Sequence, residues 1–287
     1  MRNKVQQYSN RQYMLSTDYE IFHYKNTEMT GVSLHHHDFY ECYLFISGDV
    51  TYHIEGRIYN LAPGDIVLIN SKELHKAIIN NKDVAYERIV LWLNRSFLRK
   101  ISSEETDLTL CFESDKKKNV LRMDFETQKN IRLVLNKILS VQKNKGFGYE
   151  LLYSAYITEL MVYINTILFN KDIVLDIDIK KSNLIDSIIE YINNNIEEDI
   201  TIDELAEYCY LSKFHLSREF KRHTGTTIHK YIVQKKLIQA KELILNNISI
   251  KEVYKKCGFG DYSNFFRAFK NEYGVTPKQF YESMYKE

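Results

Sequence analysis

The sequence predicts an α+β multidomain chain, with an N-terminal antiparallel β-domain that carries helices and a C-terminal all-α domain with two helix-turn-helix units joined by a long helix. Three observations carry this prediction: short β-rich runs broken by turn signals, then apolar residues at helical spacing, then an internal repeat. A chain of 287 residues is long enough for two domains. Its 44% hydrophobic and 27% charged residues exclude a disordered or collagen-like chain.

The β-domain is expected over about residues 15–123. Runs rich in Val, Ile, Tyr and Phe alternate there with turn signals, at Ser47-Gly48-Asp49, Glu55-Gly56, Pro63-Gly64-Asp65 and Asn80-Asn81-Lys82-Asp83. Frequent turns between short β-rich runs are typical of an antiparallel barrel or sandwich.

Two helices are expected next, within about residues 124–170. Apolar residues recur at spacings of three and four over Phe125–Gln142 and Tyr149–Leu168. These apolar stripes are wide enough to form the seam of a homodimer, although packing onto the β-domain or the C-terminal half would also use them. The short, charged segment 170–182 has no helical period, so we divide the chain into a domain of residues 1–175, which includes the possible dimer seam, and a domain of residues 176–287.

The C-terminal domain contains an internal repeat. At an offset of 48, four residues recur, and at an offset of 49 five more do: Ile200, Ile202, Glu204 and Cys209 match Ile248, Ile250, Glu252 and Cys257, and Arg218, Phe220, Lys221, Gly225 and Thr227 match Arg267, Phe269, Lys270, Gly274 and Thr276. Each copy opens on a predicted capping box, Thr201 with Glu204 and Ser249 with Glu252. Each second helix is expected to start after Ser212 or Asp261 and to stop at a glycine, so each copy is a helix-turn-helix.

The second helix of each copy has the composition of a helix that enters a DNA major groove. Leu216 with Phe220, and Phe265 with Phe269, should face inward. The residues expected to face outward and contact DNA are Lys213, Phe214, Ser217 and Arg218 in the first copy and Tyr262, Ser263, Phe266 and Arg267 in the second. Arg218 and Arg267 hold equivalent positions and are expected to bind guanine or phosphate; the alternative is that they are ordinary surface arginines.

Charge and spacing agree with a DNA partner. Residues 208–287 hold 15 Lys and Arg against 7 acidic residues, a net charge of +8 that the whole-chain value of +1 conceals. A predicted helix over Thr227–Asn246 joins the two copies and would be about 30 Å long. Successive major grooves on one face of DNA are about 34 Å apart, so one chain could fill both grooves.

These motifs closely resemble the AraC/XylS family of transcriptional regulators over about Leu184–Tyr285. The matching strings are Leu205-Ala206, Ser212-x-x-x-Leu216-x-Arg218-x-Phe220-Lys221, Ala240 with Leu243, Cys257-Gly258-Phe259, Phe265-x-Arg267-x-Phe269-Lys270 and Gly274-x-Thr276-Pro277. The resemblance implies double-stranded DNA as a partner and RNA polymerase as a further partner of an activator. It also implies base contacts by Phe214, Ser217 and Arg218 in the first copy and by Tyr262, Ser263, Phe266 and Arg267 in the second. Phe214 and Phe266 depart from hydrogen-bonding residue types and would offer apolar contact instead.

Histidines and a glutamate gather in the β-domain. His35-x-His37-x-x-x-Glu41 places three such side chains on one face of a predicted strand, with His36 on the opposite, exposed face and His75 downstream. The spacing up to Gly48 resembles the first signature of cupins, small β-barrels that form the effector domain of many AraC-type regulators. The second signature is not matched, because Val67 stands where it has a histidine.

We therefore expect a cupin-like pocket for a small-molecule effector, lined by His35, His37, Glu41, Tyr43 and His75, with no cofactor. Two alternatives stay open: His35, His37, Glu41 and His75 bind a divalent metal ion, or the histidines are structural. Tyr43, Phe45, Tyr52 and Trp92 are expected to add aromatic surface that suits a sugar or another small organic molecule.

The favoured function is a cytoplasmic, sequence-specific transcriptional regulator, an activator rather than an enzyme. A metal-dependent cupin enzyme with an accessory DNA-binding domain is the alternative, and an interaction protein is a third. No uninterrupted apolar run approaches the roughly 18 residues of a membrane span, and the opening residues MRNKVQQYSN lack the apolar stretch of a secretion signal. The four cysteines form no C-x-x-C pair and are expected to be reduced.

Overall fold

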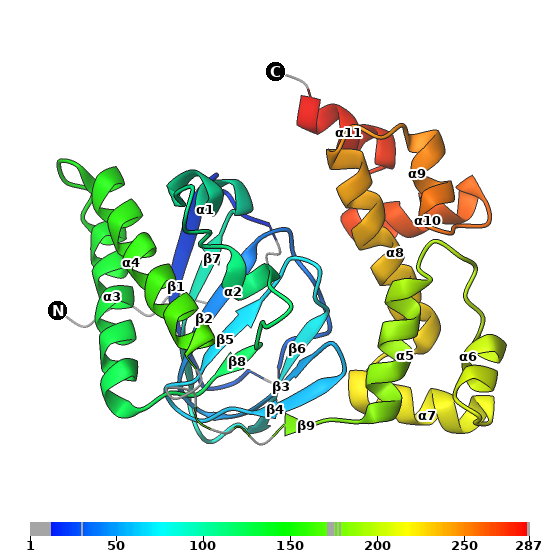
Figure 1. Ribbon diagram of the computed structural model, residues 1–287, viewed down its shortest axis with the longest axis horizontal. Helices are drawn as coiled ribbons and strands as arrows, with labels where there is room; N and C mark the ends of the chain where they lie inside the picture. The colour runs from blue at the N-terminus through cyan, green and yellow to red at the C-terminus, as the bar shows by residue number, and fades with distance from the viewer. Residues whose placement is uncertain (1–12, 30, 171–174, 176, 178, 286–287) are drawn as a thin grey trace. The chain divides into compact units, whose positions relative to one another are not determined.

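The computed structural model describes residues 13–29, 31–170, 175, 177 and 179–285. The chain divides into two compact units, one of residues 1–54 and 58–180 and the other of residues 181–287 together with the turn residues 55–57 (Figure 1). Each unit is described below by itself. The opening residues examined for a secretion signal, and residues 171–174, 176 and 178 of the expected boundary segment, lie outside the described residues.

The N-terminal unit is built on two antiparallel sheets. Its strands are β1 (Tyr19–Asn26), β2 (Tyr40–Ser47), β3 (Asp49–Ile54), β4 (Arg57–Asn60), β5 (Ile66–Ile69), β6 (His75–Asn81), β7 (Tyr86–Leu93), β8 (Val120–Leu121) and β9 (Ile179–Lys180). One sheet has the order β1-β7-β2-β5-β8 and the other β6-β3-β4-β9. The predicted antiparallel β-domain is confirmed. The sequence did not predict β9, which pairs with β4 inside the segment expected to be irregular.

Strands β2 and β7 are buried on both faces. Along β2, Tyr43 and Phe45 point to a core shared by the two sheets, whereas Cys42 and Leu44 point to a second core on the other side. Strand β7 pairs with β2 and alternates in the same way, since Val90 and Trp92 join the first core and Leu91 and Leu93 the second. The period-2 alternation of a strand thus gives one sheet an inner and an outer face.

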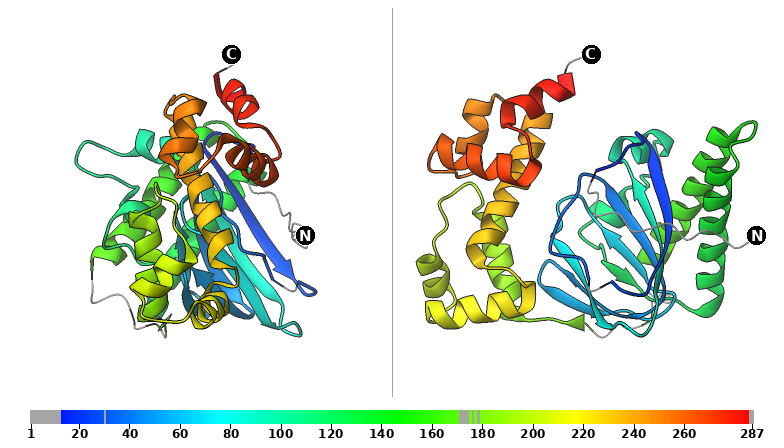
Figure 2. Two further views of the ribbon diagram at one scale, coloured as in Figure 1. Left: turned by 90° about the vertical axis from the view of Figure 1, so that its right-hand side faces the viewer. Right: turned by 180° about the vertical axis from the view of Figure 1, so that it is seen from behind.

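Four helices cover the outer face of the five-stranded sheet: α1 (Arg95–Ile101), α2 (Leu110–Glu113), α3 (Phe125–Lys143) and α4 (Tyr149–Phe169) (Figures 1 and 2). The predicted pair α3 and α4 is confirmed. Helices α1 and α2 lie within the expected β-domain and were not predicted, because helices of seven and four residues are too short to show a helical period in sequence.

Helix α4 is long and apolar enough, by length and composition alone, to cross a bilayer. Glu150 and Glu159 interrupt its apolar residues, which is why the search for uninterrupted runs missed it. A third of its most apolar stretch is buried inside the protein, and Leu160 and Ile164 are fully covered. Core helices pass the same test, so this property assigns no membrane role.

An ion pair between the partly exposed Arg122 and the buried Asp65 ties the end of the barrel sequence to the turn before β5. The Arg122 guanidinium donates from Nε to Asp65 Oδ1 at 2.9 Å and from Nη2 to Asp65 Oδ2 at 2.7 Å. Asp65 is fully buried and also accepts from the Ala62 amide. Arg122 donates further to the Asn60 carbonyl. The bidentate pair therefore fixes the chain at the point where it leaves β8 for helix α3.

Every described element of the C-terminal unit from residue 183 onward is a helix, as predicted. The helices are α5 (Asn183–Asn194), α6 (Ile202–Tyr208), α7 (Lys213–Thr224), α8 (Ile228–Leu245), α9 (Ile250–Lys256), α10 (Tyr262–Tyr273) and α11 (Pro277–Tyr285). Ser212 and Asp261 cap α7 and α10, and Gly225 and Gly274 end them in left-handed conformations, as expected. The Thr201–Glu204 capping box forms, but the Ser249–Glu252 box does not, because the Ser249 hydroxyl donates to the Glu252 carboxylate instead of capping the backbone.

The two turns of the repeat have the same backbone hydrogen bonds at an offset of 48. The Leu211 amide donates to the Ala206 carbonyl, and the Phe259 amide donates to the Tyr254 carbonyl. The preceding residue is left-handed in both turns, Tyr210 with φ +54° and Gly258 with φ +64°. Tyr210 is exposed, whereas a Cβ on Gly258 would lie 2.6 Å from the carbonyl oxygens of Glu197 and Glu198. Only the second turn therefore demands glycine on steric grounds.

Lys236 of α8 holds that close approach together. Its buried ammonium donates to the Glu198 carbonyl at 2.7 Å and to the Gly258 carbonyl at 2.6 Å. The segment before α6, in the first copy, is thereby fastened to the turn of the second copy. One side chain of the connecting helix thus cross-links the two helix-turn-helix copies.

We expect Asp65→Asn to lower the free energy of unfolding of the N-terminal unit by about 3 kcal/mol, because it leaves the Arg122 guanidinium without its buried counter-charge. Urea unfolding followed by Trp92 fluorescence measures this, since Trp92 is the sole tryptophan and lies in the barrel core. The exposed Asp83→Asn is the matched control. Equal stability of the two variants would contradict the role given to the ion pair.

We expect Lys236→Met to destabilise the C-terminal unit by about 1–3 kcal/mol, because the carbonyls of Glu198 and Gly258 lose the donor that joins them. Thermal unfolding of the full chain by circular dichroism measures the change, with Trp92 fluorescence reporting the barrel separately. Lys230→Met, an exposed change on the same helix, should have no effect. A Lys236→Met protein as stable as Lys230→Met would show that the cross-link adds nothing.

Candidate functional site

Helices α7 and α10 each pack one face inward and leave the other open. Leu216 and Phe220 of α7, and Phe265 and Phe269 of α10, have no exposed surface. These are the inward pairs expected from sequence. The buried pairs occupy equivalent positions in the two helices. Residues at equivalent positions on the opposite faces therefore point away from the core in both copies.

On α7, Lys213, Phe214 and Arg218 are exposed and Ser217 is half-buried. Phe214 has 76% of its surface open to solvent, although it is aromatic. The Arg218 guanidinium lies 6.0 Å from the centroid of the Phe214 ring and 3.3 Å from His215 Nδ1. Lys213 forms an exposed ion pair with an acidic residue of α6, Asp203.

On α10, Tyr262, Ser263 and Arg267 are exposed and Phe266 is half-buried. Arg267 donates from Nη2 to Asn264 Oδ1 at 2.7 Å and from Nε to the Ser263 carbonyl at 3.4 Å. The eight residues named from sequence therefore lie on two helices, four on each.

Sequence reasoning missed two residues next to the arginines. His215 and Asn264 stand at equivalent positions, 49 residues apart, and each contacts the arginine three residues later. An intrahelical partner holds each guanidinium over the open face of its helix. The repeat itself carries the signal, since aligning the copies at an offset of 49 pairs these two polar residues.

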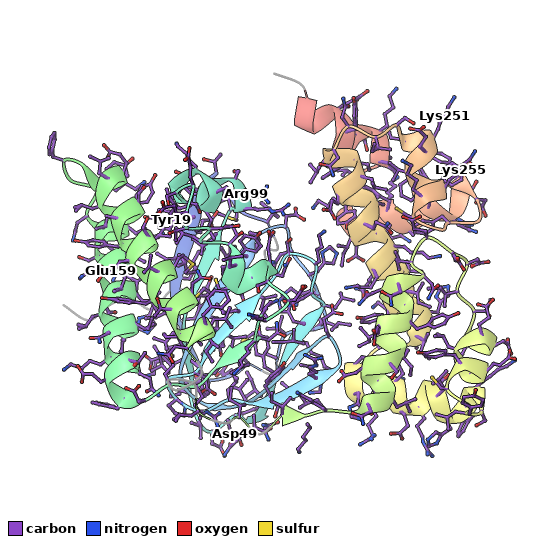
Figure 3. The ribbon with its side chains drawn as sticks, in the orientation of Figure 1. Tyr19, Asp49, Arg99, Glu159, Lys251 and Lys255 are labelled. Carbon is purple, nitrogen blue, oxygen red and sulfur yellow. The ribbon has the colours of Figure 1, made fainter. Side chains whose placement is uncertain are left out.

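The second copy also presents basic residues outside α10. Figure 3 shows Lys251 and Lys255 on α9, and both are exposed. Neither was singled out from sequence, because a lysine in a short helix has no motif of its own. Exposed ammonium groups of this kind can pair with anionic groups such as phosphates.

The barrel encloses a polar pocket of about 200 Å³. Its lining includes His35, His37, Glu41 and Tyr43, as expected, and Arg88. Tyr52 and Trp92 line it too, but Phe45 lies in the core elsewhere and is not among the lining residues. His75 is fully buried beside the pocket, its ring centroid 4.2 Å from that of His35 and 4.9 Å from that of His37.

The expectation that His35, His37 and Glu41 share one strand is wrong. Strand β2 begins at Tyr40, so only Glu41 lies on it. His35 forms an isolated bridge with His75, and His37 lies in the segment between that bridge and β2. His36 was expected to be exposed and is buried, with 6% of its surface open. Tertiary folding, rather than the strand period, brings the pocket histidines together.

The carboxylate of Glu41 is buried among hydrogen-bond donors. Trp92 Nε1 donates to Oε2 at 2.9 Å, and the Tyr52 hydroxyl lies 3.4 Å from Oε1. Burial raises the pKa of Glu41 above its usual value, and the Trp92 hydrogen bond opposes that rise. Arg88 supplies positive charge in the same pocket, between the rings of Tyr24 and Tyr86.

Burial lowers the pKa of His35 and drives those of His37 and His75 well below the usual value, so these imidazoles are neutral at physiological pH. One ligand atom each from His37, Glu41 and His75 lies within 4.8 Å of the other two. These three residues are the candidate metal ligands among the described parts of the chain. The geometry therefore contains two candidate sites, the open faces of α7 and α10 and the barrel pocket.

Comparison with known proteins agrees with this division. The family described as AraC-like ligand binding domain matches residues 19–161, and the family described as helix-turn-helix domain matches residues 205–283. A curated relative, the HTH-type transcriptional activator RhaS of Mannheimia succiniciproducens, is 26% identical over 85% of this chain and 87% of its own length. RhaS of Salmonella paratyphi A is 21% identical over 85% of each chain.

Among solved structures, ToxT from Vibrio cholerae is 14% identical, with a TM-score of 0.36, over 95% of this chain and 100% of its own. The C-terminal domain of the response regulator yesN from Fusobacterium nucleatum is 33% identical over 35% of this chain and 100% of its own, with a TM-score of 0.34.

The two family matches fall on the two units, one on the barrel with its helices and one on the paired helix-turn-helix copies. The N-terminal match identifies the barrel as a cupin-like ligand-binding domain, and the C-terminal match identifies a DNA-binding domain. The chain therefore belongs to the AraC family of transcriptional regulators.

Proposed function

We propose that this protein is a cytoplasmic activator of transcription that binds a specific DNA site through α7 and α10 and responds to a small molecule in the barrel. The observation that carries the proposal is the pair of equivalent open helix faces, each with an exposed arginine at the same position and an apolar anchor behind it. The activator name of the curated relatives supports the direction of regulation and, with it, RNA polymerase as a partner. In this proposal the barrel senses a ligand and catalyses no reaction.

Specificity would come from two kinds of contact. Arg218 and Arg267 suit guanine, whose major-groove edge offers two acceptors to one guanidinium. Phe214, Tyr262 and Phe266 add apolar surface that suits thymine methyl groups. The connecting helix α8 has 18 residues and is about 27 Å long, a length compatible with recognition helices in adjacent major grooves.

The effector in this proposal is a small, polar organic molecule. The pocket offers imidazole, carboxylate and guanidinium groups together with the rings of Tyr43, Tyr52 and Trp92. A sugar fits this chemistry, since hydroxyl groups pair with polar side chains and the ring stacks on aromatic faces. An effector screen that uses the selected DNA site as its probe would identify the compound.

Dimerisation through α4 is part of the proposal. Leu151, Ala155, Val162 and Phe169 follow helical spacing and are all exposed, with 72% of Leu151 open to solvent. An apolar stripe of this kind on a long helix commonly marks an interface. A second copy of the chain would cover it with the same stripe, because a twofold interface is self-complementary.

Selection of bound sequences from random duplex DNA at fixed salt tests DNA recognition. We expect a bipartite site with halves about one helical turn apart. Arg218→Ala and Arg267→Ala should each weaken binding to that site by about 1–3 kcal/mol, because each removes a charged donor from a base or phosphate.

Arg132→Ala, an exposed arginine of α3 in the other unit, is the matched control and should bind normally. If both recognition-helix variants bind the selected site as tightly as this control, the residue assignment fails. If no sequence is enriched with or without candidate effectors, sequence-specific DNA recognition fails as well.

The double variant Leu151→Glu with Val162→Glu should be monomeric, because burying two carboxylates across a twofold axis opposes association. Sedimentation velocity of the wild type and the variant measures this. Val84→Glu places the same change on an exposed turn residue and should leave a dimer intact. A monomeric wild type, or a dimeric double variant, would reject α4 as the seam.

A further inference from the structure

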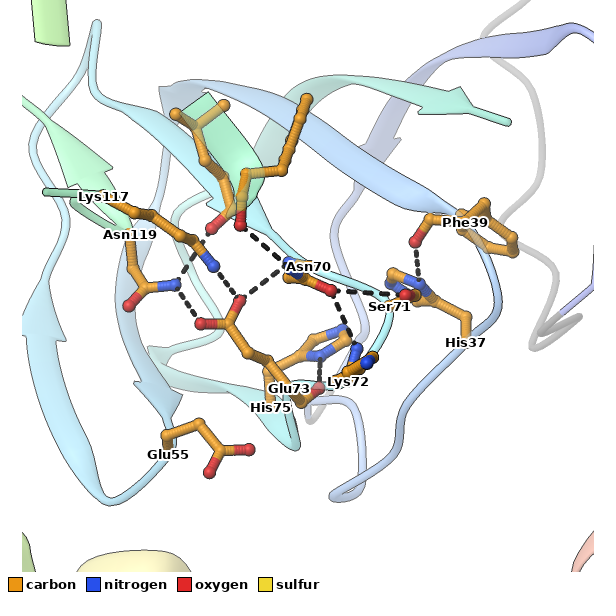
Figure 4. Close-up of polar contacts among 12 residues, drawn as sticks. His37, Phe39, Glu55, Asn70, Ser71, Lys72, Glu73, His75, Lys117 and Asn119 are labelled. Atoms are coloured by element: carbon orange, nitrogen blue, oxygen red, sulfur yellow. Dashed lines mark hydrogen bonds and ion pairs between the residues drawn. The ribbon is translucent and has the colours of Figure 1, made fainter. Parts of the chain in front are cut away.

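The pocket histidines are oriented by backbone carbonyls. His37 Nδ1 lies 2.8 Å from the Phe39 carbonyl oxygen, and His75 Nδ1 lies 2.9 Å from that of Glu73 (Figure 4). His35 Nδ1 makes the same contact with the Ser33 carbonyl at 2.9 Å. A carbonyl oxygen can only accept, so Nδ1 must carry the proton in all three rings. Each neutral ring therefore has its lone pair on Nε2.

Two of these lone pairs have no hydrogen-bond partner among the described residues. Nε2 of His37 and Nε2 of His75 are buried and unpaired, and both side chains are fully enclosed. Leaving a buried acceptor without a partner costs about 1–3 kcal/mol. Two such acceptors in one place are a reason to expect a ligand that accepts electron pairs.

The carboxylate of Glu41 completes the cluster. Its Oε2 lies 3.8 Å from His37 Nε2, and the three ligand atoms lie within 4.8 Å of one another. Trp92 and Tyr52 hold the carboxylate from the other side, as carbonyls hold the imidazoles. Ligands whose other polar atoms are fixed by neighbouring groups are characteristic of metal sites in proteins.

We propose that His37 Nε2, His75 Nε2 and the Glu41 carboxylate bind one divalent transition-metal ion in the barrel pocket. Two atoms bound to one tetrahedral zinc ion are about 3.4 Å apart, given bond lengths of about 2.0–2.1 Å. The 3.8 Å between His37 Nε2 and Glu41 Oε2 is close to this separation, and the widest pair in the cluster would have to shorten by up to about 1.4 Å on binding. Two imidazoles and one carboxylate suit zinc, iron, manganese, cobalt or nickel.

A metal ion in this site would contribute to effector binding. Three protein ligands leave at least one coordination position on the ion for water or for an oxygen atom of a bound molecule. The metal would thus add an oxygen-binding point to a pocket that already holds Arg88. The inference rests on the proposed function only in taking this pocket as the regulatory one; metal binding itself depends on neither DNA nor effector.

Titration of the full-length, untagged protein with Co²⁺ after chelator treatment tests the proposal. Bound Co²⁺ is paramagnetic and should quench the fluorescence of Trp92, the sole tryptophan, whose indole donates to the ligand Glu41. Equilibrium dialysis with Zn²⁺ and elemental analysis gives the stoichiometry. We expect one equivalent per chain and saturable quenching with the same midpoint as binding.

His75→Gln and Glu41→Gln should each weaken Co²⁺ and Zn²⁺ binding at least tenfold. Glu41→Gln keeps an oxygen acceptor for Trp92, so it removes the charge of the ligand with little change in packing. If His75→Gln does not fold, the Glu41→Gln titration alone tests the metal site. His23→Gln removes a histidine of β1 that bonds to Glu87, outside the cluster, and should bind normally.

Substoichiometric binding without quenching of Trp92 would overturn the proposal. So would equal affinity of the wild type and a folded Glu41→Gln protein. Because the titrations contain no DNA, either result would leave the DNA-binding proposal standing. Failure of the DNA selection would likewise leave the metal result intact.

Discussion

The N-terminal unit depends on the burial of β2 on both of its faces. One set of alternating side chains, Glu41, Tyr43 and Phe45, builds the pocket and the core between the sheets. The other set, Cys42 and Leu44, packs against the helices that include α3 and α4. Together with its neighbour β7, this strand forms the wall between the pocket and the helical layer. Any change in its position on ligand binding reaches both, because close-packed side chains transmit displacement.

The C-terminal unit has a comparable constraint in the turn of its second copy. Gly258 lets the carbonyls of Glu197 and Glu198 approach, and Lys236 then bonds across the contact. The first copy has no such demand, so Tyr210 occupies the equivalent left-handed position on the surface. Two copies with the same hydrogen-bond pattern are therefore joined asymmetrically. The buried apolar pairs of α7 and α10 are equivalent in the two copies, whereas the exposed residues of the two helices differ.

The pocket combines neutral imidazoles, a buried carboxylate and a guanidinium in a small volume. Such a set is costly to bury unless each group has a partner. Backbone carbonyls satisfy one nitrogen of each imidazole, and Trp92 satisfies one oxygen of Glu41. The groups left over point to ligand recognition, because packing alone would be served better by apolar residues.

The sequence by itself determined what repeats and local periodicity can carry. Capping residues, glycine stops and the offsets of 48 and 49 identified both helix-turn-helix copies, and the wide apolar stripes identified α3 and α4. These features depend on residues close together in the chain. Local signals failed where tertiary contacts decide: Ser249 does not cap its helix, α1 and α2 are too short to show a period, and His36 is buried. The pocket is the clearest case, because His35, His37 and Glu41 do not share a strand. Only folding of β6 against the segment before β2 sets His75 beside them, and only the carbonyls of Phe39 and Glu73 orient the free nitrogens inward.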